Sequence, residues 1–273
     1  MPASAGTAEE SSGSVQSVDR ALTILELLAA DGELGVTQIA GLLGVHKSTA
    51  SRLLATLEAH GLAEQLPDRG RYQLGVGLLR LAGSTRVRLD IVRESRPISR
   101  RLAADTGETV NLVILSGTET LYLDQVEGPS ALQIYHWVGR RNPLHATANG
   151  RVLLAHASKA EQDAIIGAIS DQRHRLPALT PHTLTSPDDL RSALTEVRRR
   201  GYDLAIDELE VGLTAVAAPV RAADGSVIGS LSVSGPGFRL TADRIHDTVR
   251  AVIAAADEVS RRMGYTPARP TVG

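Results

Sequence analysis

Residues 39–74 read IAGLLGVHKSTASRLLATLEAHGLAEQLPDRGRYQL, a short apolar segment followed by a turn, a longer helical segment and a hairpin-like tail. Gly44 supplies the permissive backbone for a turn between two helices. The second helix is expected over 47–60, because apolar residues recur there at helical spacing. Its buried face is predicted to consist of Ala50, Leu53, Leu54 and Leu57.

Polar and basic side chains fall outside that apolar face, near the N-terminal end of the second helix. In a helix-turn-helix protein this end reaches base edges in the major groove of DNA. Ser and Thr hydroxyls bond bases or phosphates, and Arg grips guanine with two hydrogen bonds. The pattern therefore predicts a DNA-reading helix with five contact residues: Lys47, Ser48, Thr49, Ser51 and Arg52.

The hairpin that follows is predicted to form a wing, with strands over 62–66 and 71–74 joined by a turn at 67–70. Arg69 and Arg71 at its tip are expected to meet phosphate or the minor groove.

An earlier helix is expected over 17–30, with Ala21, Leu22, Ile24, Leu25 and Leu28 on one face. The same module could instead serve protein contacts.

Composition limits the function classes. The chain has 273 residues and a formal net charge of −2, so DNA binding must come from a local patch. The absence of cysteine excludes disulfides and thiolate metal sites. Residues 1–14 lack the features of a signal peptide and are expected to be a disordered tail. No apolar run is long enough to span a membrane, and a cytoplasmic protein is expected.

We expect four further segments after this tail: a winged helix-turn-helix domain at 15–75, linker helices at 76–106, a second domain at 107–264 and a disordered tail at 265–273. Pro97 is expected to break or kink the linker. Residues 80–101 hold seven arginines against Asp90 and Glu94. These arginines either contact phosphate, pack against a second subunit or form a solvated helical face.

The second domain changes to a period of two. Strands are expected over 109–115, 120–126, 132–137, 215–221 and 226–234. Helices are expected over 146–157, 159–169, from Ser186-Pro187 to Gly201, and from Thr241 to about 263, with a loop at 170–185. The fold class is therefore α+β, an antiparallel sheet flanked by helices, and such a sheet offers a cup for a small ligand.

Residues 143–154, PLHATANGRVLL, place small residues at the start of a helix. The small side chains of Ala146, Thr147, Ala148 and Gly150 leave backbone N–H groups open, and a helix N-terminus favours an anion such as a carboxylate. Asn149 is expected to add a hydrogen bond from its side-chain amide. Capping by Thr147 with close packing at Gly150 explains the pattern equally well. Ser232 and Ser234 alternate, so both hydroxyls point to one face of a strand and suit a polar ligand or a purely structural role.

Enzymatic and metal chemistry find little support. The acids Asp207, Glu208 and Glu210 suggest general acid-base catalysis or a metal, but neither a nucleophile nor a phosphate loop accompanies them. His136, His145 and His156 lie 9 and 11 residues apart, which is too scattered for a metal signature. We expect no catalytic residue, no metal site and no cofactor.

Several segments resemble the IclR-type transcriptional regulators: SVDRALTILELLA, GVHKSTASRLLATLEAHGLAEQ, RYQLGVGLLRLA, TGETVNLVIL, PLHATANGRVLLA and GLTAVAAPVRAADGSVIGSLSVSGP. They occur in the family's order and cover nearly everything from residue 15 to about 263. The resemblance implies a winged helix-turn-helix joined by a linker helix to a GAF-like effector domain. It also implies a homodimer or homotetramer on a palindromic operator, and most relatives are expected to repress and some to activate.

The resemblance further implies an effector pocket, which by position would contain Ile134, Ala148, Asn149, Asp207, Leu213, Ala215, Ser232 and Ser234. Which acid around 207 and 208 belongs to the pocket stays open. Asn142 and Asn149 stand where the family usually has apolar or small residues, which favours a small polar carboxylate or ureide as the effector. A small-molecule enzyme with an accessory winged module, or a protein-interaction adaptor, remain the alternatives.

Overall fold

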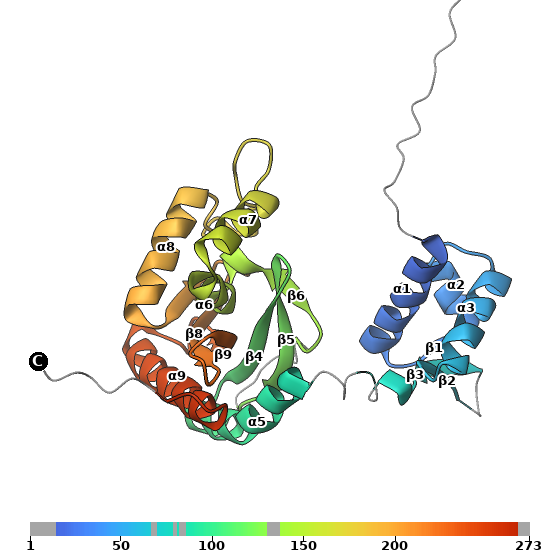
Figure 1. The fold of residues 1–273 in the computed structure, drawn as a ribbon, viewed down its shortest axis with the longest axis horizontal. Helices are drawn as coiled ribbons and strands as arrows, with labels where there is room; N and C mark the ends of the chain where they lie inside the picture. The colour runs from blue at the N-terminus through green and yellow to red at the C-terminus, as the bar shows by residue number, and fades with distance from the viewer. Residues whose placement is uncertain (1–14, 67–69, 79–80, 82–85, 130–136, 267–273) are drawn as a thin grey trace, which may run out of the picture. The chain divides into compact units, whose positions relative to one another are not determined.

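A computed structural model describes residues 15–66, 70–78, 81, 86–129 and 137–266, with the side chains of 86–89 excepted (Figure 1). The chain divides into two compact units, Met1–Arg86 and Val87–Gly273. The division falls at the start of helix α5 (Arg86–Thr106), so this helix belongs with the second unit.

The first unit includes three helices that the structure describes over their whole length, and a small antiparallel sheet. The helices are α1 (Gln16–Asp31), α2 (Val36–Leu42) and α3 (Lys47–Ala59). The strands β1 (Leu34–Gly35), β2 (Ala63–Gln65) and β3 (Arg71–Leu74) lie in the order β1-β3-β2. Strand β1 is only two residues long, which is too short to show a periodic pattern in the sequence.

Apolar side chains from all three helices and from β3 form the core of this unit. Gly44 has a φ of +62°, which is the left-handed turn expected between α2 and α3. Two side chains differ from the expected pattern: Leu53 is only partly buried, and Leu22 is 56% exposed on α1. The buried set includes Ile24, Leu28, Ile39, Ala50, Leu54, Leu57 and Tyr72.

The second unit is built on a six-stranded sheet in the order β6-β5-β4-β9-β8-β7, in which every pairing is antiparallel. The predicted α+β class is confirmed. The strands are β4 (Thr109–Ser116), β5 (Glu119–Val126), β6 (Arg141–Pro143), β7 (Asp203–Ile206), β8 (Leu213–Arg221) and β9 (Val227–Pro236).

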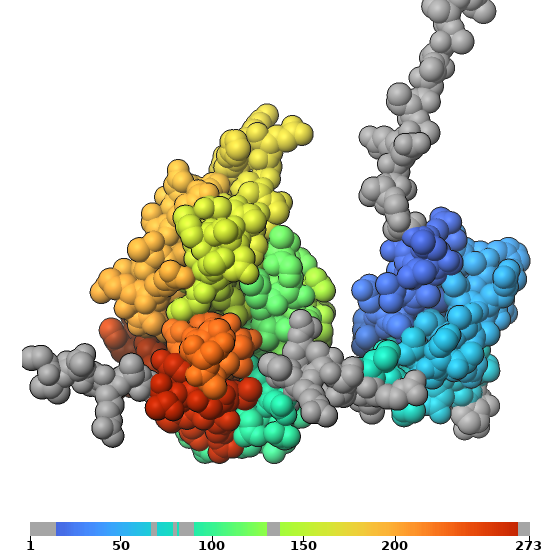
Figure 2. Space-filling model, in the orientation of Figure 1, coloured from blue at the N-terminus to red at the C-terminus, as the bar shows by residue number. Residues whose placement is uncertain are grey.

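Helices cover the two faces of this sheet. Helix α5 and the last helix, α9 (Ala242–Arg262), pack on one face, where Val110, Val216 and Val233 point. Helices α6 (Ala148–His156), α7 (Lys159–Ile169) and α8 (Pro187–Arg200) belong to the core that includes Ala217 on the other face. The predicted loop that follows α7 projects from the body of this unit (Figures 1 and 2).

Pro97 does not break α5, although the sequence suggested that it would break or kink the helix. Proline removes one hydrogen bond of the helix. The helix continues because Ile91, Ile98 and Leu102 are buried against the sheet, and this burial outweighs the lost bond.

Part of the predicted strand 132–137 lies outside the described residues, and Trp137 at its end is not in a strand. The sequence does not indicate β6 and β7, which have three and four residues and lack the turn motif that marks the equally short strands β2 and β3 of the wing. Among the described residues, no helix is both long and apolar enough to cross a membrane.

Candidate DNA-reading helix and effector pocket

Helix α3 presents the predicted contact residues to solvent. Lys47, Ser48, Ser51 and Arg52 are exposed and Thr49 is half-buried, while the opposite face is held in the core. Within the part of the chain that the structure describes, neither Lys47 nor Arg52 forms an ion pair. Both cations are therefore available to a polyanion.

The wing is described only in part. Arg71 lies in β3, its guanidinium 4.0 Å from the Glu33 carboxylate and still half exposed. An exposed pair of this length contributes little to stability, so it leaves Arg71 free to exchange Glu33 for phosphate. Arg69 lies outside the described residues.

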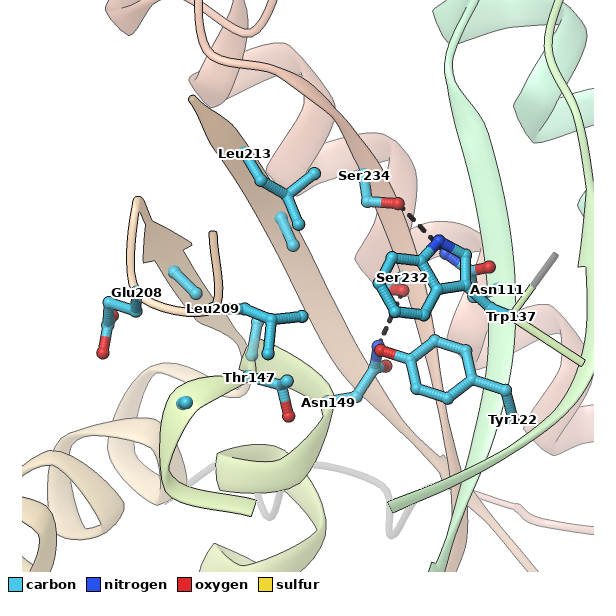
Figure 3. Close-up of a pocket in the computed structure, with 14 residues that line it drawn as sticks. Asn111, Tyr122, Trp137, Thr147, Asn149, Glu208, Leu209, Leu213, Ser232 and Ser234 are labelled. Atoms are coloured by element: carbon cyan, nitrogen blue, oxygen red, sulfur yellow. Dashed lines mark hydrogen bonds between the residues drawn. The ribbon is translucent and has the colours of Figure 1, made fainter. Parts of the chain in front are cut away.

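A pocket opens in the second unit between the sheet, the start of α6 and the loop after β7 (Figure 3). It brings together six of the eight predicted effector residues: Ala148, Asn149, Leu213, Ala215, Ser232 and Ser234. Ile134 lies outside the described residues. Eight further residues complete the lining: Asn111, Tyr122, Trp137, Ala146, Thr147, Ala205, Glu208 and Leu209.

The start of α6 faces this pocket, and the local sequence explains how. Thr147 is the N-cap, and its Oγ1 accepts a hydrogen bond of 3.0 Å from the Gly150 N–H. A Cβ on Gly150 would come within 2.2 Å of the Leu144 carbonyl oxygen, so only glycine fits. Capping and close packing thus hold the helix start against the pocket, where its positive dipole end favours a negative or electron-rich group.

Two asparagine-serine pairs line the pocket floor (Figure 3). The Asn111 Nδ2 donates to Ser234 Oγ at 3.0 Å, and the Asn149 Nδ2 donates to Ser232 Oγ at 2.9 Å. Asn111 on β4 lies directly opposite Ser232 on β9 in the sheet register. The amide oxygens of both asparagines are buried and have no hydrogen-bond partner among the residues that the structure describes.

Glu208, and not Asp207, is the acid at the pocket. Asp207 has a φ of +60°, and its Oδ1 accepts a 2.6 Å hydrogen bond from the Gly212 N–H. The Asp207 carboxylate therefore stabilises its own loop and does not line this pocket. The sequence could not choose between neighbouring acids, because an irregular loop has no fixed period.

The Glu208 carboxylate is neutralised by Arg151, whose side chain is 3% exposed. Two guanidinium nitrogens of Arg151 donate to Glu208 at 2.5 and 2.8 Å, and its Nε donates to Asp203 at 2.6 Å. The carbonyl oxygens of His145 and Leu204 accept the remaining bonds. All the donors of this guanidinium are thus satisfied by the protein, and none is left for a ligand.

An aromatic wall closes another side of the pocket. The rings of Tyr122 and Trp137 stack with centroids 5.5 Å apart and an interplanar angle of 27°. Burial raises the pKa of the Tyr122 hydroxyl, with the amides of Asn142 and Asn149 acting against it, so the phenol is neutral. Sequence reasoning missed both aromatics and Asn111; only the alternation along the strands at 109–115 and 120–126 pointed toward this face.

The cavity is small and without free charge. Its volume is about 30 Å³, room for about two water molecules. The described lining includes no Lys, Arg or His. No group of three or more His, Cys, Asp or Glu side chains among the described residues is placed to hold a metal ion.

The arginines of α5 are largely engaged within the second unit. Arg93 pairs with Asp90 and Glu94, Arg96 lies 3.7 Å from Asp124, and Arg101 donates to Glu258 at 2.6 Å. Arg80, Arg86 and Arg88 have no described side chains. The positive charge that the sequence concentrates at 80–101 is therefore partly neutralised by acids of α5, β5 and α9.

Comparison with known proteins decides what these two sites belong to. A model of the IclR helix-turn-helix domain matches residues 17–67, and a model of the bacterial transcriptional regulator IclR C-terminal region matches residues 84–261. The chain belongs to the IclR family. It is accordingly a DNA-binding transcriptional regulator, in a family of regulators and not of enzymes.

Individual IclR relatives are similar over nearly the whole chain. The HTH-type transcriptional regulator XynR of Escherichia coli is 37% identical over 92% of this chain and 98% of its own length. The transcriptional repressor IclR of Escherichia coli is 32% identical over 92% and 91%. The crystal structure of an IclR homolog from Microbacterium hydrocarbonoxydans, complexed with 4-hydroxybenzoate, has a TM-score of 0.77 and 27% identity over 90% and 98% of the two chains.

Proposed function

We propose that the chain is a cytoplasmic, sequence-specific repressor that a small polar metabolite, a carboxylate or a ureide, releases from a palindromic operator. The observation that carries the proposal is the pocket of the second unit, where the start of α6 and two Asn–Ser pairs meet a stacked aromatic wall. A repressor is the form favoured by relatives such as the IclR repressor and the acetate operon repressor of Salmonella typhimurium.

The reading surface consists of Lys47, Ser48, Thr49, Ser51 and Arg52, with Arg69 and Arg71 in the wing. Support comes from the exposure of four of the five helix residues and from the absence of ion pairs at Lys47 and Arg52 among the described residues. The 4-hydroxybenzoate complex of a relative supports a carboxylate as the effector class. The effector residues are those of the pocket lining, with Glu208 in place of Asp207.

The regulator acts as a homodimer or homotetramer. Helix α1 supports this, because three apolar side chains lie exposed at spacings of three and four residues, one at its N-cap and two along it: Val15, Val18 and Leu22 at 65%, 54% and 56%. Residues at this spacing share one helix face. A second copy of the same stripe would cover them and bring two reading helices onto one operator.

Operator binding tests the reading surface. Arg52→Ala should weaken binding to promoter DNA by about 1–3 kcal/mol if Arg52 reads a base, or lower the salt dependence by about one phosphate contact if it does not. The measurement is a binding titration at several salt concentrations. Arg250→Ala is the matched control, because Arg250 is a well-exposed arginine on α9.

Wild-type affinity and salt slope in Arg52→Ala would remove Arg52 from the contact set. Absence of any salt-dependent binding by the unaltered protein would favour a protein-interaction adaptor. Transcription that falls in a strain lacking the gene would identify an activator instead of a repressor.

A further inference from the structure

The unpaired amide oxygens of Asn111 and Asn149 are the least expected feature of the pocket. The two residues are only 2% and 3% exposed, and each uses its amide nitrogen on a serine. A buried polar atom without a partner costs about 1–3 kcal/mol, so natural proteins keep few of them. Two such atoms on one cavity floor indicate that something else completes them.

Each Asn–Ser pair presents a hydrogen-bond acceptor beside a donor. With the amide nitrogen bonded to the serine oxygen, the amide oxygen accepts and the hydroxyl hydrogen is free to donate. If the amide is turned over, the serine donates to the amide oxygen, and the pair then presents an N–H donor beside a hydroxyl acceptor. Either orientation leaves each pair with at least one donor beside an acceptor.

The other residues that line the pocket further restrict the chemical class of its ligand. No cationic side chain lines the described pocket, and Glu208 is already neutralised by Arg151. A plain keto acid brings only acceptors, so it would satisfy the serine hydroxyls and the helix start but not the amide oxygens. A ligand that carries a donor next to its acceptor satisfies both members of a pair.

We propose that this pocket selects a small molecule with an N–H or O–H donor beside a carbonyl or carboxylate oxygen, as in an α-hydroxy acid or an amide. The inference rests on the proposed function, since it names the chemical class of the effector. The volume of about 30 Å³ is too small for a large ligand without movement of the lining, which favours a compact molecule.

The test is a panel of matched fragments, measured with the full-length protein by calorimetry and ligand-observed NMR. Lactate and lactamide carry the donor, 2-methoxypropionate and the N,N-dimethyl amide of 2-methoxypropionic acid have it blocked, and pyruvate lacks it. The donor-bearing forms should bind at least about ten-fold tighter than their counterparts, as expected when a buried acceptor would otherwise stay unpaired.

Two variants assign the preference to the asparagines. Asn149→Leu and Asn111→Leu preserve side-chain size and should each reduce the preference for donors to about two-fold or less. Ser230→Ala is the control. Ser230 is buried on β9, the strand of Ser232 and Ser234, where its hydroxyl donates to the Ala218 carbonyl, and it does not line the pocket. If the leucine variants fail to fold, the matched fragments on the unaltered protein still decide.

Equal binding of donor and donor-blocked fragments would overturn the proposal, and so would a preference that survives both leucine variants. Absence of binding by every donor-bearing fragment at high millimolar concentration would leave trapped water as the partner of the amides and would also overturn it. Operator affinity is measured separately, because fragments that bind selectively without changing it would refute regulation through this pocket and leave the ligand class standing.

Discussion

Arg151 carries a buried charge, and its contribution to stability depends on the carboxylates that pair with it. Asp203 and Glu208 compensate it, and Arg200 donates a further bond of 2.8 Å to Asp203. Burial lowers the pKa of Arg151, but the two carboxylates outweigh it and raise the pKa overall. The guanidinium stays charged and ties α6 to β7 and to the loop that carries Glu208.

Removing Arg151 should therefore leave the Glu208 carboxylate without its cation, while Asp203 keeps only Arg200. Arg151→Met is expected to lower the free energy of unfolding by about 3–5 kcal/mol, the usual cost of breaking a buried pair from one side. Urea denaturation of the variant measures it. Arg199→Met is the control, because the exposed Arg199–Glu196 pair on α8 should contribute little to stability. A small loss in Arg151→Met would mean that water reaches the site.

His145 predicts how stability depends on pH. Burial lowers its pKa, helped by Arg151 and opposed by the hydrogen bond to the Pro177 carbonyl and by Glu208. In the unfolded chain a histidine titrates near pH 6.5. As the pH falls through that value, the unfolded state binds a proton that the folded state does not bind. The contribution of His145 to stability is therefore fully present above that pH and decreases below it.

Stability should therefore fall between about pH 7 and pH 5, with a shallower fall in His145→Gln. Burial also lowers the pKa of His156, so part of the slope will remain in that variant. Thermal unfolding across this range measures the effect, and His182→Gln, at an exposed position, should leave the profile unchanged. A variant as steep as the unaltered protein would contradict the assignment.

The sequence predicted those pocket residues that lie in an alternating strand or at the capped start of a helix. Alternation placed Ser232 and Ser234 on one face, and the small residues before α6 marked Ala148 and Asn149. Asn111 and Trp137 come from other elements, and only the sheet order brings them there. That order depends on long-range pairing, which a single sequence does not display.

At the level of elements, strong end signals made the helices of the second unit predictable. Ser186 caps α8 through the Asp189 N–H, and Gly201 ends it in the left-handed region. Strands β1, β6 and β7 have only two to four residues and, unlike the equally short β2 and β3, have no tight-turn motif in the sequence to mark them as arms of a hairpin. Helix α1 was predicted correctly, but its outward face was not, since Leu22 is exposed.

The exposed stripe of α1 leads to a prediction about assembly. Leu22→Glu should keep the fold, because surface substitutions change stability by about 0.5 kcal/mol or less. It should place a charge in the α1 interface and shift the protein toward monomer in sedimentation velocity. Leu42→Glu, at a residue of α2 that is 59% exposed, is the control. An unchanged mass in Leu22→Glu would move the interface to another surface.

At the scale of the molecule, each unit has its own core, and α5 belongs to the second one. Ile91, Ile98 and Leu102 bury the apolar face of α5 against the sheet, while its Arg93 and Arg101 pair with acids of the same unit. A pocket rearrangement that moves the sheet should therefore move α5 with it, because both belong to the second unit. One reading helix with few cations is expected to bind weakly by itself, so we propose that a second copy adds the missing affinity.

Pairing two copies makes affinity depend on the spacing of the half-sites. In a helix-turn-helix dimer the two reading helices engage half-sites about 34 Å apart, one turn of DNA. Inserting about five base pairs between the half-sites turns one of them to the opposite face of the duplex. Affinity should then fall by about 10²-fold or more, since the gain from simultaneous engagement is lost. Footprinting and titration of the altered operator measure this, and Leu22→Glu should bind both operators equally weakly. If the insertion leaves the affinity unchanged, each reading helix acts alone.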